Sequence, residues 1–169
     1  MVDEEGARSA DDAIAARSSR VYVDVVGDLF HAGHVSLFRE ARRHGDWLVV
    51  GVLSDDTAAS YKRRPIMSLA ERVAVIESCR YVDEVIEDAP MQVTEEFLAR
   101  HDIDTVVHGD DLSPEAVEFV YGPAAAAGKL QFVRRTGGIS TTQLIQRVLD
   151  ATSSSPPVGH PVRGGSTGR

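Results

Sequence analysis

Two histidines, His31 and His34, are the residues of this 169-residue chain whose type and spacing most clearly suggest chemistry. They follow an apolar run typical of a buried strand, so we expect a helix to begin at this point. Residues three apart share one face of a helix, and Gly33 between them leaves room for a ligand to approach closely. Imidazole donors and helix-start amides would then converge on one anion. Spacing alone also allows a polar pair at a helix start, or a metal site with a third ligand from Asp28 or Asp110.

The elements that must position these histidines follow from the apolar pattern. Short apolar runs alternate with amphipathic stretches, which predicts five strands at residues 21–26, 47–53, 84–87, 105–108 and 130–133. The second run is apolar without alternation, as expected of a parallel strand covered by helices on both faces. Right-handed crossovers then predict a single Rossmann-like, doubly wound α/β domain with strand order 3-2-1-4-5. The ligand crevice should open between the first and fourth strands, beside the histidine loop and residues 108–111.

Helix-start signals and composition define the expected domain. Ser68 with Glu71, and Ser140 with Gln143, match the reciprocal capping box, while Ser113 precedes a proline at a first helical position. We expect one ordered domain over residues 20–151. Residues 1–19 form an acidic leader, and residues 152–169 form a tail rich in Ser, Pro and Gly; neither can build a core, so both are expected to be flexible.

Composition and charge narrow the function classes. The formal net charge of −8 argues against a protein that coats nucleic acid. No apolar run approaches the roughly 18 residues that cross a bilayer, and the N-terminus lacks a secretion signal. The single cysteine, Cys79, lies in an apolar helical pattern and is expected in the core, so disulfides within the chain and cysteine-based zinc clusters are excluded. We expect a cytoplasmic protein that acts on small molecules.

Three motifs in order carry a family resemblance. Residues 28–34 include the H-x-G-H segment, residues 79–85 read C-R-Y-V-D-E-V, and residues 135–142 read R-T-G-G-I-S-T-T. From about Val21 to Leu149 the chain resembles the cytidylyltransferases that activate ethanolamine phosphate, choline phosphate, glycerol 3-phosphate and related phosphonates. The resemblance implies transfer of CMP from CTP, release of pyrophosphate, a requirement for Mg2+, and a homodimer.

The implied reaction fits the residues present. A phosphoryl oxygen of the acceptor attacks the α-phosphorus of CTP; because this oxygen is already ionised, the main task is to hold two anions together and to neutralise developing charge. The resemblance assigns His31 and His34 to the α-phosphate and the departing bridge oxygen, Lys62 to both reactants, and Arg135 to the β- and γ-phosphates. Without the family, Lys62 is better interpreted as a solvated loop charge.

A larger nucleotide-binding set is implied by the same motifs and by the loop after the fourth strand. Several members have simpler explanations: Arg80 suits a helix C-terminus, Ser140 caps a helix, and Asp111 is a turn acid. The full set is Val26, Gly27, Asp28, Gly33, Arg80, Asp111, Thr136, Gly138, Ile139, Ser140 and Thr141.

The acceptor site is expected to contain Lys62, Arg63, Arg64 and Met91. Choline- and ethanolamine-phosphate enzymes tend to place an aromatic residue where Met91 stands, and an aromatic face attracts an ammonium group. The two arginines add positive charge that would favour a second anionic group, although both could simply face solvent. The sequence therefore predicts an acceptor that is neutral or anionic beyond its phosphoryl group, such as a hydroxyalkyl or carboxy phosphonate, or glycerol phosphate.

Two other functions remain open at this level. An adenylyltransferase that uses ATP would share H-x-G-H and a serine-threonine helix start, although the wording of the last motif favours CTP. A non-catalytic nucleotide-sensing module would bind nucleotide without turnover. That alternative leaves the joint presence of His31, His34, Lys62 and Arg135 without a reason.

Overall fold

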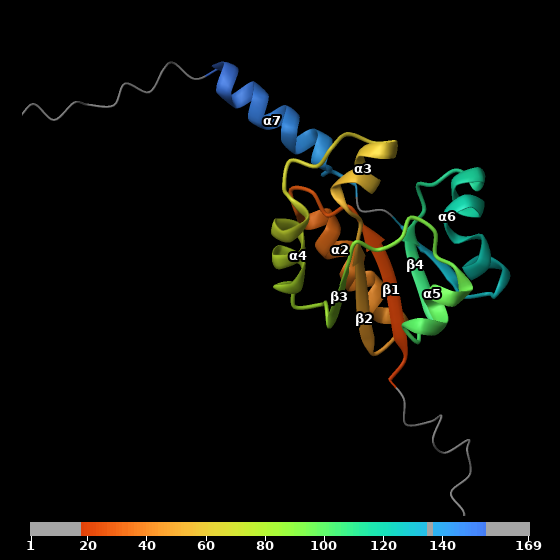
Figure 1. Cartoon of the computed structure of the whole chain (residues 1–169). Coiled ribbons are helices and arrows are strands. Elements are labelled where there is room, and N and C mark those ends of the chain that lie inside the picture. The colour runs from red at the N-terminus through yellow and green to blue at the C-terminus, as the bar shows by residue number, and fades with distance from the viewer. Residues whose placement is uncertain (1–17, 135–136, 155–169) are drawn as a thin grey trace, which may run out of the picture.

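A parallel sheet of five strands in the order β3-β2-β1-β4-β5 forms the centre of the molecule, as the sequence predicts. The computed structural model describes residues 18–134 and 137–154. All strands point the same way, and their carboxyl ends meet at the upper edge in Figure 1. The strands are β1 (Arg20–Val25), β2 (Trp47–Val52), β3 (Glu84–Glu87), β4 (Thr105–Gly109) and β5 (Leu130–Val133). The order reverses between β1 and β4, where the crevice was expected.

Helices fill the gaps between the strands. The expected capping box at Ser68 is present at the start of α4, and Ser113 caps α6 with proline at its first turn. The amide of Gln143 donates to Ser140 Oγ over 3.2 Å just before α7. The helices are α2 (Ala32–Ala41), the 3-10 turn η1 (Arg42–His44), α3 (Asp55–Tyr61), α4 (Leu69–Glu77), α5 (Glu95–Arg100), α6 (Pro114–Ala126) and α7 (Thr141–Ser154).

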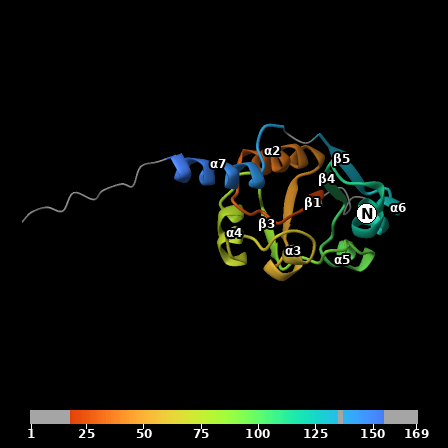
Figure 2. The same ribbon diagram turned by 90° about the horizontal axis from the view of Figure 1, so that it is seen from above.

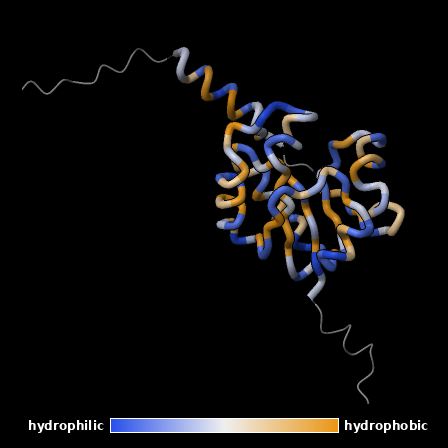
Figure 3. The backbone as a smooth tube through the Cα atoms, in the orientation of Figure 1, coloured by the Kyte–Doolittle hydropathy of each residue, from blue (hydrophilic) through white to orange (hydrophobic). Residues whose placement is uncertain are grey.

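Two apolar cores lie on opposite faces of the sheet. Val21 and Val23 pack with Phe38 of α2 and Ile76 of α4, and half-buried Cys79 joins this core. Tyr22, Val49 and Val106 pack on the other face with residues of α5 and α6. Figure 2 shows α2 and α5 on opposite sides of the sheet, and Figure 3 shows hydrophobic residues concentrated on the strands between them. Because successive strand residues point to opposite faces, residue 24 of β1 shares the α6 side with Tyr22.

The ends of the described chain differ slightly from the expected domain limits. Ser19, expected in the leader, is bound to the sheet, since its carbonyl accepts from the amides of Asp46 and Trp47. Helix α7 continues to Ser154, beyond the limit at residue 151, with the Thr152 and Ser153 hydroxyls bonded to the Leu149 carbonyl. It projects away from the body of the domain (Figure 1). Residues 1–17 and 155–169, where most of the leader and tail were expected, lie outside the described residues.

No helix in the described part of the chain combines the length and the hydropathy needed to cross a membrane.

Candidate active site

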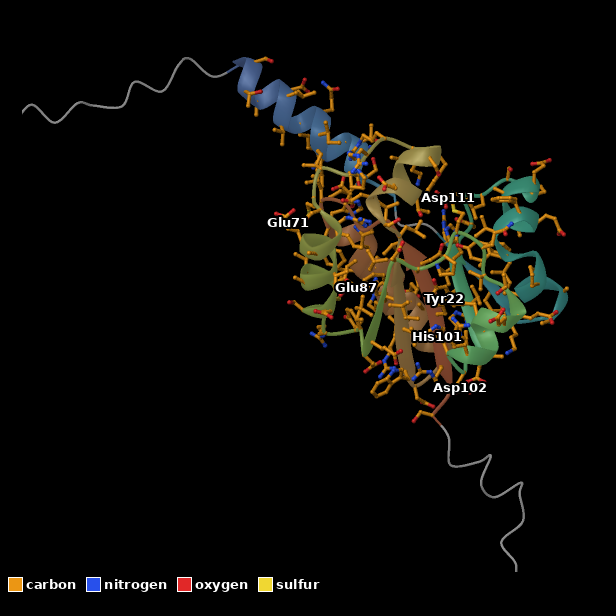
Figure 4. All side chains as sticks on the ribbon, viewed as in Figure 1. Tyr22, Glu71, Glu87, His101, Asp102 and Asp111 are labelled. Atoms are coloured by element: carbon orange, nitrogen blue, oxygen red, sulfur yellow. The ribbon has the colours of Figure 1, made fainter. Side chains whose placement is uncertain are left out.

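A cavity of about 950 Å³ opens at the carboxyl ends of β1 and β4. Its walls come from the turn after β1, the end of α3, the segment after β4, one side of α6 and the start of α7. Asp111, on its wall, lies beyond the upper end of β4 in Figure 4, whereas His101 and Asp102 lie at the opposite end of the sheet. The cavity therefore lies where the strand order reverses, the position at which the crevice was expected and at which this architecture usually binds ligands.

The turn between β1 and α2 has an unusual backbone. Gly27 has a φ of 73°, and a Cβ added there would lie 2.7 Å from Ile76 Cδ1. Leu29 also has a positive φ, 48°, which costs energy for a residue with a side chain. This conformation reverses the chain within a few residues, so the two histidines begin the next helix at the cavity wall.

The two imidazoles form a reciprocal cap at the start of α2. Nδ1 of His31 accepts from the amide of Gly33 over 3.1 Å, and Nδ1 of His34 accepts from the amide of His31 over 3.2 Å. A backbone N–H can only donate, so neither Nδ1 carries a proton in this arrangement. In the neutral rings the proton is therefore on Nε2. The cap thus gives each histidine a fixed tautomer with one N–H donor at the far side of the ring.

Burial keeps His34 neutral. Its ring stacks on Phe30 at 5.4 Å between centroids and lies 4.0 Å from the ring of His31. Burial, then the neighbouring His31, lowers the pKa of His34 from 6.5 to about 4, and Lys62 adds to this effect while Asp28 opposes it. At neutral pH His34 is therefore a hydrogen-bond donor through Nε2 without a net charge.

Gly33 leaves room for the ring of His31 because it has no side chain. A Cβ at this position would lie 2.8 Å from Cε1 and 2.9 Å from Nδ1 of His31. The sequence led us to expect that a ligand would approach Gly33; the structure shows that the ring of His31 uses this space. Any larger residue here must displace the imidazole from its cap.

Buried Asp28 forms an ion pair with the partly exposed side chain of Arg63. Asp28 is 3% exposed, and its carboxylate accepts from Arg63 Nη2 at 2.6 Å and from the amides of Ile66 and Met67 at 3.1 and 3.0 Å. Burial alone would raise the pKa of Asp28, but the two amides and Arg63 outweigh it and hold the pKa below its ordinary value. Arg63 lines the cavity, yet its guanidinium is engaged by this carboxylate.

Arg64 and Arg80, both expected in the site, do not lie on the cavity wall. Arg64 pairs with Asp56 at 2.5 Å, and both side chains are largely exposed. Arg80 is exposed, with its guanidinium 5.2 Å from the ring centre of Tyr81. The expectation that Arg63 and Arg64 add positive charge at the acceptor site stays a prediction; here Arg63 lies on the cavity wall, Arg64 does not, and each is paired with a carboxylate.

The start of α7 closes the cavity near the histidines. Ile139, Ser140 and Thr141 lie on the wall as expected, and Thr141 Oγ1 donates to the carbonyl of Asp28 over 3.0 Å. Gly138, with a φ of 96°, belongs to the preceding turn and is not on the wall. Arg135 and Thr136, also expected in this site, lie outside the described residues.

The α6 side of the cavity contains a buried acid that the sequence reasoning missed. Asp24 is 8% exposed and accepts from the hydroxyl of Tyr121 at 2.5 Å, across 97 residues of sequence. Burial raises the pKa of Asp24, against the opposing effects of Tyr121, His108 and Lys62. Tyr61, also on the wall, has its pKa raised to about 12 by burial and by Asp24. The sequence signal was present: Asp24 is the charged residue inside an otherwise apolar strand.

Lys62 lies on the cavity wall and acts electrostatically on both halves of the cavity. It follows directly after α3, where its backbone amide donates to the Ala58 carbonyl over 3.0 Å. Its charge lowers the pKa of both His34 and Asp24. Together with Val26, Met91 and Asp111 it lies on the wall, as expected from the sequence. The site thus has a histidine half, formed by His31, His34 and the start of α7, and an acidic half around Asp24. The charge of Lys62 acts on both.

A fully buried arginine, also missed, supports this edge of the sheet. Arg72 is 0% exposed and donates to the carbonyls of Val26, Leu53 and Met67, and to Asp55 Oδ1 at 2.5 Å. Val26 and Leu53 lie just after β1 and β2, and Asp55 and Met67 precede and follow Lys62 in the chain. Arg72 therefore fixes the backbone from which the site residues project.

Comparison with known proteins agrees with this geometry. The sequence model of the Cytidylyltransferase-like family matches residues 27–147. The chain is 45% identical over 134 residues to the ethanolamine-phosphate cytidylyltransferase of Dictyostelium discoideum, covering 79% of this chain and 37% of that protein. It is 40% identical over 136 residues to the choline-phosphate cytidylyltransferase A of Homo sapiens, with coverage of 79% and 37%.

A solved structure shares the fold. The crystal structure of a lipopolysaccharide core biosynthesis protein from Thermoplasma volcanium aligns with a TM-score of 0.60 and 25% identity, over 73% of this chain and 100% of that one. The chain spans about a third of the length of the curated relatives, 37% and 32% for two ethanolamine-phosphate enzymes. Sequence, strand order and site geometry agree that the chain belongs to the cytidylyltransferase-like family.

Proposed function

We propose that this chain transfers CMP from CTP to a phosphoryl oxygen of a small phosphoalcohol or phosphonate. The acceptor oxygen forms a bond to the α-phosphorus of CTP, the bond from that phosphorus to the bridging oxygen breaks, and its electron pair leaves with pyrophosphate. The observation that carries the proposal is the cavity with the capped histidine pair on one side, a buried carboxylate on the other, and Lys62 acting on both. This arrangement suits two anionic reactants that must meet without a general base.

The nucleotide occupies the histidine half in this proposal. The Nε2–H groups of His31 and His34 donate to the α-phosphate and to the bridging oxygen, where charge develops as pyrophosphate departs. The amides at the start of α7, near Ser140 and Thr141, suit the outer phosphates. Arg135 stays a prediction for the β- and γ-phosphates, because it lies outside the described residues.

The acceptor occupies the acidic half, with its phosphoryl group beside Lys62 and its other end beside Asp24. A buried carboxylate is a suitable counter-ion for a cationic tail. The expectation of a neutral or anionic tail rested on Met91 and on the charges of Arg63 and Arg64, and these two arginines are paired with Asp28 and Asp56. We therefore propose an amino-alcohol phosphate as the preferred acceptor, in keeping with the names of the relatives.

Phe119 supplies an aromatic face in this half although Met91 does not. It lies on the cavity wall with 59% of its surface exposed, so a ligand in the cavity can contact the ring. The Met91 segment is fixed next to it, since Gln92 Nε2 donates to the Phe119 carbonyl over 3.1 Å and the Val93 amide donates to the Val120 carbonyl over 2.8 Å. An ammonium group near Asp24 would gain cation–π attraction from such a ring.

Magnesium is proposed to enter with the nucleotide. Among the described residues, no group of three or more His, Cys, Asp or Glu side chains could hold a metal ion. Magnesium bound to triphosphates commonly uses phosphate oxygens and water, so a protein cage is unnecessary. When bound, the ion offsets phosphate charge; the positioning of the reactants is the task of the side chains described above.

An acceptor panel tests the proposal. The chain is incubated with CTP, magnesium and either phosphoethanolamine, phosphocholine, glycerol 3-phosphate or a carboxy phosphonate, and pyrophosphate release is followed. We expect the amino-alcohol phosphates to give the highest kcat/KM. The variant Asp24→Asn should lose this preference by about tenfold or more, whereas Asp102→Asn, at the opposite end of the sheet, should keep it. A panel in which glycerol 3-phosphate or the phosphonate is preferred contradicts the proposed acceptor class.

The alternatives give different results in the same assay. Dominant use of ATP would identify an adenylyltransferase. Tight nucleotide binding with no turnover of any acceptor would identify a sensing module. A homodimer and a cytoplasmic location also stay predictions, for analytical ultracentrifugation and cell fractionation respectively.

A further inference from the structure

We propose that Asp28 is a positioning residue that holds Lys62 at the cavity by binding the chain just after it. The inference rests on the proposed function for the role of Lys62, but the contacts themselves are independent of it. The segment concerned, residues 63–67, connects the end of α3 to α4.

The carboxylate of Asp28 contacts this segment at three donors. Arg63 Nη2 is 2.6 Å from Oδ2, the Ile66 amide lies 3.1 Å from both oxygens, and the Met67 amide is 3.0 Å from Oδ1. Asp28 itself is 3% exposed. A buried carboxylate whose two oxygens both accept from one short segment is bound to that segment strongly, because charge-assisted hydrogen bonds are the strong class.

The other side-chain contact of residues 63–66 with a neighbouring element is the exposed ion pair between Arg64 and Asp56 of α3, and exposed pairs of this kind contribute little. Ile66 is 60% exposed, and the side chain of Arg63 is 43% exposed. The backbone amide of Lys62 donates a hydrogen bond to the Ala58 carbonyl at the end of α3, and the Met67 carbonyl accepts one from Arg72. Between these two points, three donors of the segment bind the turn after β1, and all three bind the Asp28 carboxylate. The direction in which Lys62 leaves α3 therefore depends on this carboxylate.

Asp28 also touches the third part of the site. Its carbonyl accepts from Thr141 Oγ1 at the start of α7. Asp28 thus joins the turn after β1, residues 63–67 and the start of α7. A purely nucleotide-binding role for the Asp28 side chain would require Arg63 and two amides to give up their partner. We infer instead that Asp28 sets the relative position of the groups that would hold the two reactants.

Amide hydrogen exchange tests the contact without any need for turnover. In Asp28→Ala, exchange at Ile66 and Met67 should accelerate by about tenfold or more, since both amides lose a charged acceptor. Asp56→Ala is the matched control, because it removes the exposed ion pair of the next residue, Arg64. Its exchange at Ile66 and Met67 should not change. If Asp28→Ala does not fold, Arg63→Ala removes one donor and should give a smaller acceleration at the same amides. Unchanged exchange in the folded Asp28 or Arg63 variant overturns the proposal.

A double-mutant cycle tests the route through Lys62. Asp28→Asn keeps one acceptor oxygen, but its new NH2 group faces the Arg63 guanidinium, which is also a donor. The ion pair is lost, so kcat should fall by about tenfold or more. In the background of Lys62→Met, the same substitution should have no further effect on the residual rate. The pair Asp28→Asn with Arg63→Gln should recover activity, because the glutamine oxygen can accept from the new amide.

The two failures are distinguishable. Equal loss of kcat from Asp28→Asn with and without Lys62 would overturn the positioning role while leaving cytidylyl transfer intact. A wild-type chain with no turnover would refute the proposed function, and the exchange measurement would still decide whether Asp28 holds the segment.

Discussion

Replacing Gly33 with alanine should separate the folding of α2 from the function of the histidine pair. The new Cβ would lie 2.8 Å from Cε1 of His31, so the imidazole must rotate away and lose its 3.1 Å bond from the residue-33 amide. Loss of an N-cap bond costs about 1 kcal/mol, while alanine in place of glycine in a helix gains up to about 1 kcal/mol. The two effects nearly cancel, so the free energy of unfolding should change by less than about 1 kcal/mol.

Activity should respond very differently. If His31 donates through Nε2 to the transferring phosphate, its rotation removes one oriented donor. Loss of a comparable donor lowers kcat by about a hundredfold to a thousandfold. Thermal unfolding and pyrophosphate release on the same sample would give both quantities, with Gly122→Ala in α6 as control. There the added Cβ would meet only the flexible end of Glu118, 3.1 Å away, outside the cavity wall. A stable Gly33→Ala protein with kcat within about threefold of wild type would refute the role assigned to the capped tautomer.

Four further predictions concern stability. The pKa of His34 is about 4 in the folded chain and 6.5 ordinarily, so between these pH values the unfolded chain binds more protons. The free energy of unfolding should therefore fall by up to about 3 kcal/mol as pH drops from 6.5 to 4. Urea titrations of His34→Gln should lack this part of the drop. Arg72→Met leaves buried carbonyls and a carboxylate without their donor and should cost at least about 3 kcal/mol in the same assay, whereas exposed Arg64→Met should change little. The Tyr22 hydroxyl is buried with no hydrogen-bond partner among the described residues, so Tyr22→Phe should be neutral or stabilising. Gly51→Ala, whose Cβ would lie 2.1 Å from that hydroxyl, should cost about 1–3 kcal/mol, and part of this cost should be recovered in the double variant.

The sheet could be predicted from sequence because buried parallel strands must be apolar. The predicted strands at residues 84–87 and 130–133 coincide with β3 and β5, and the strand order is confirmed. The histidine turn could be placed because it follows β1 directly. That His31 and His34 cap the helix with each other, and that Gly33 makes space for His31, depends on side-chain orientation, which spacing does not determine.

The missed residues depend on contacts between distant parts of the chain. Asp24 and Tyr121 meet across 97 residues, and the partner of Arg63 is a carboxylate 35 residues earlier. Without these partners, two adjacent arginines look like free positive charge. Arg72 gave a usable signal: it occupies an apolar position of α4, in register with Leu69, Val73 and Ile76. A charged residue on such a stripe indicates a buried polar network.

Direct observation of the product tests the central claim most sharply. With CTP, magnesium and phosphoethanolamine, ³¹P NMR should show the α-phosphorus signal of CTP replaced by a diphosphate diester, the CMP conjugate, together with one equivalent of pyrophosphate. The rate should fall by about a hundredfold or more in His34→Gln and in Lys62→Met. Nucleotide signals that shift on binding but never convert, with every acceptor of the panel, would contradict cytidylyl transfer.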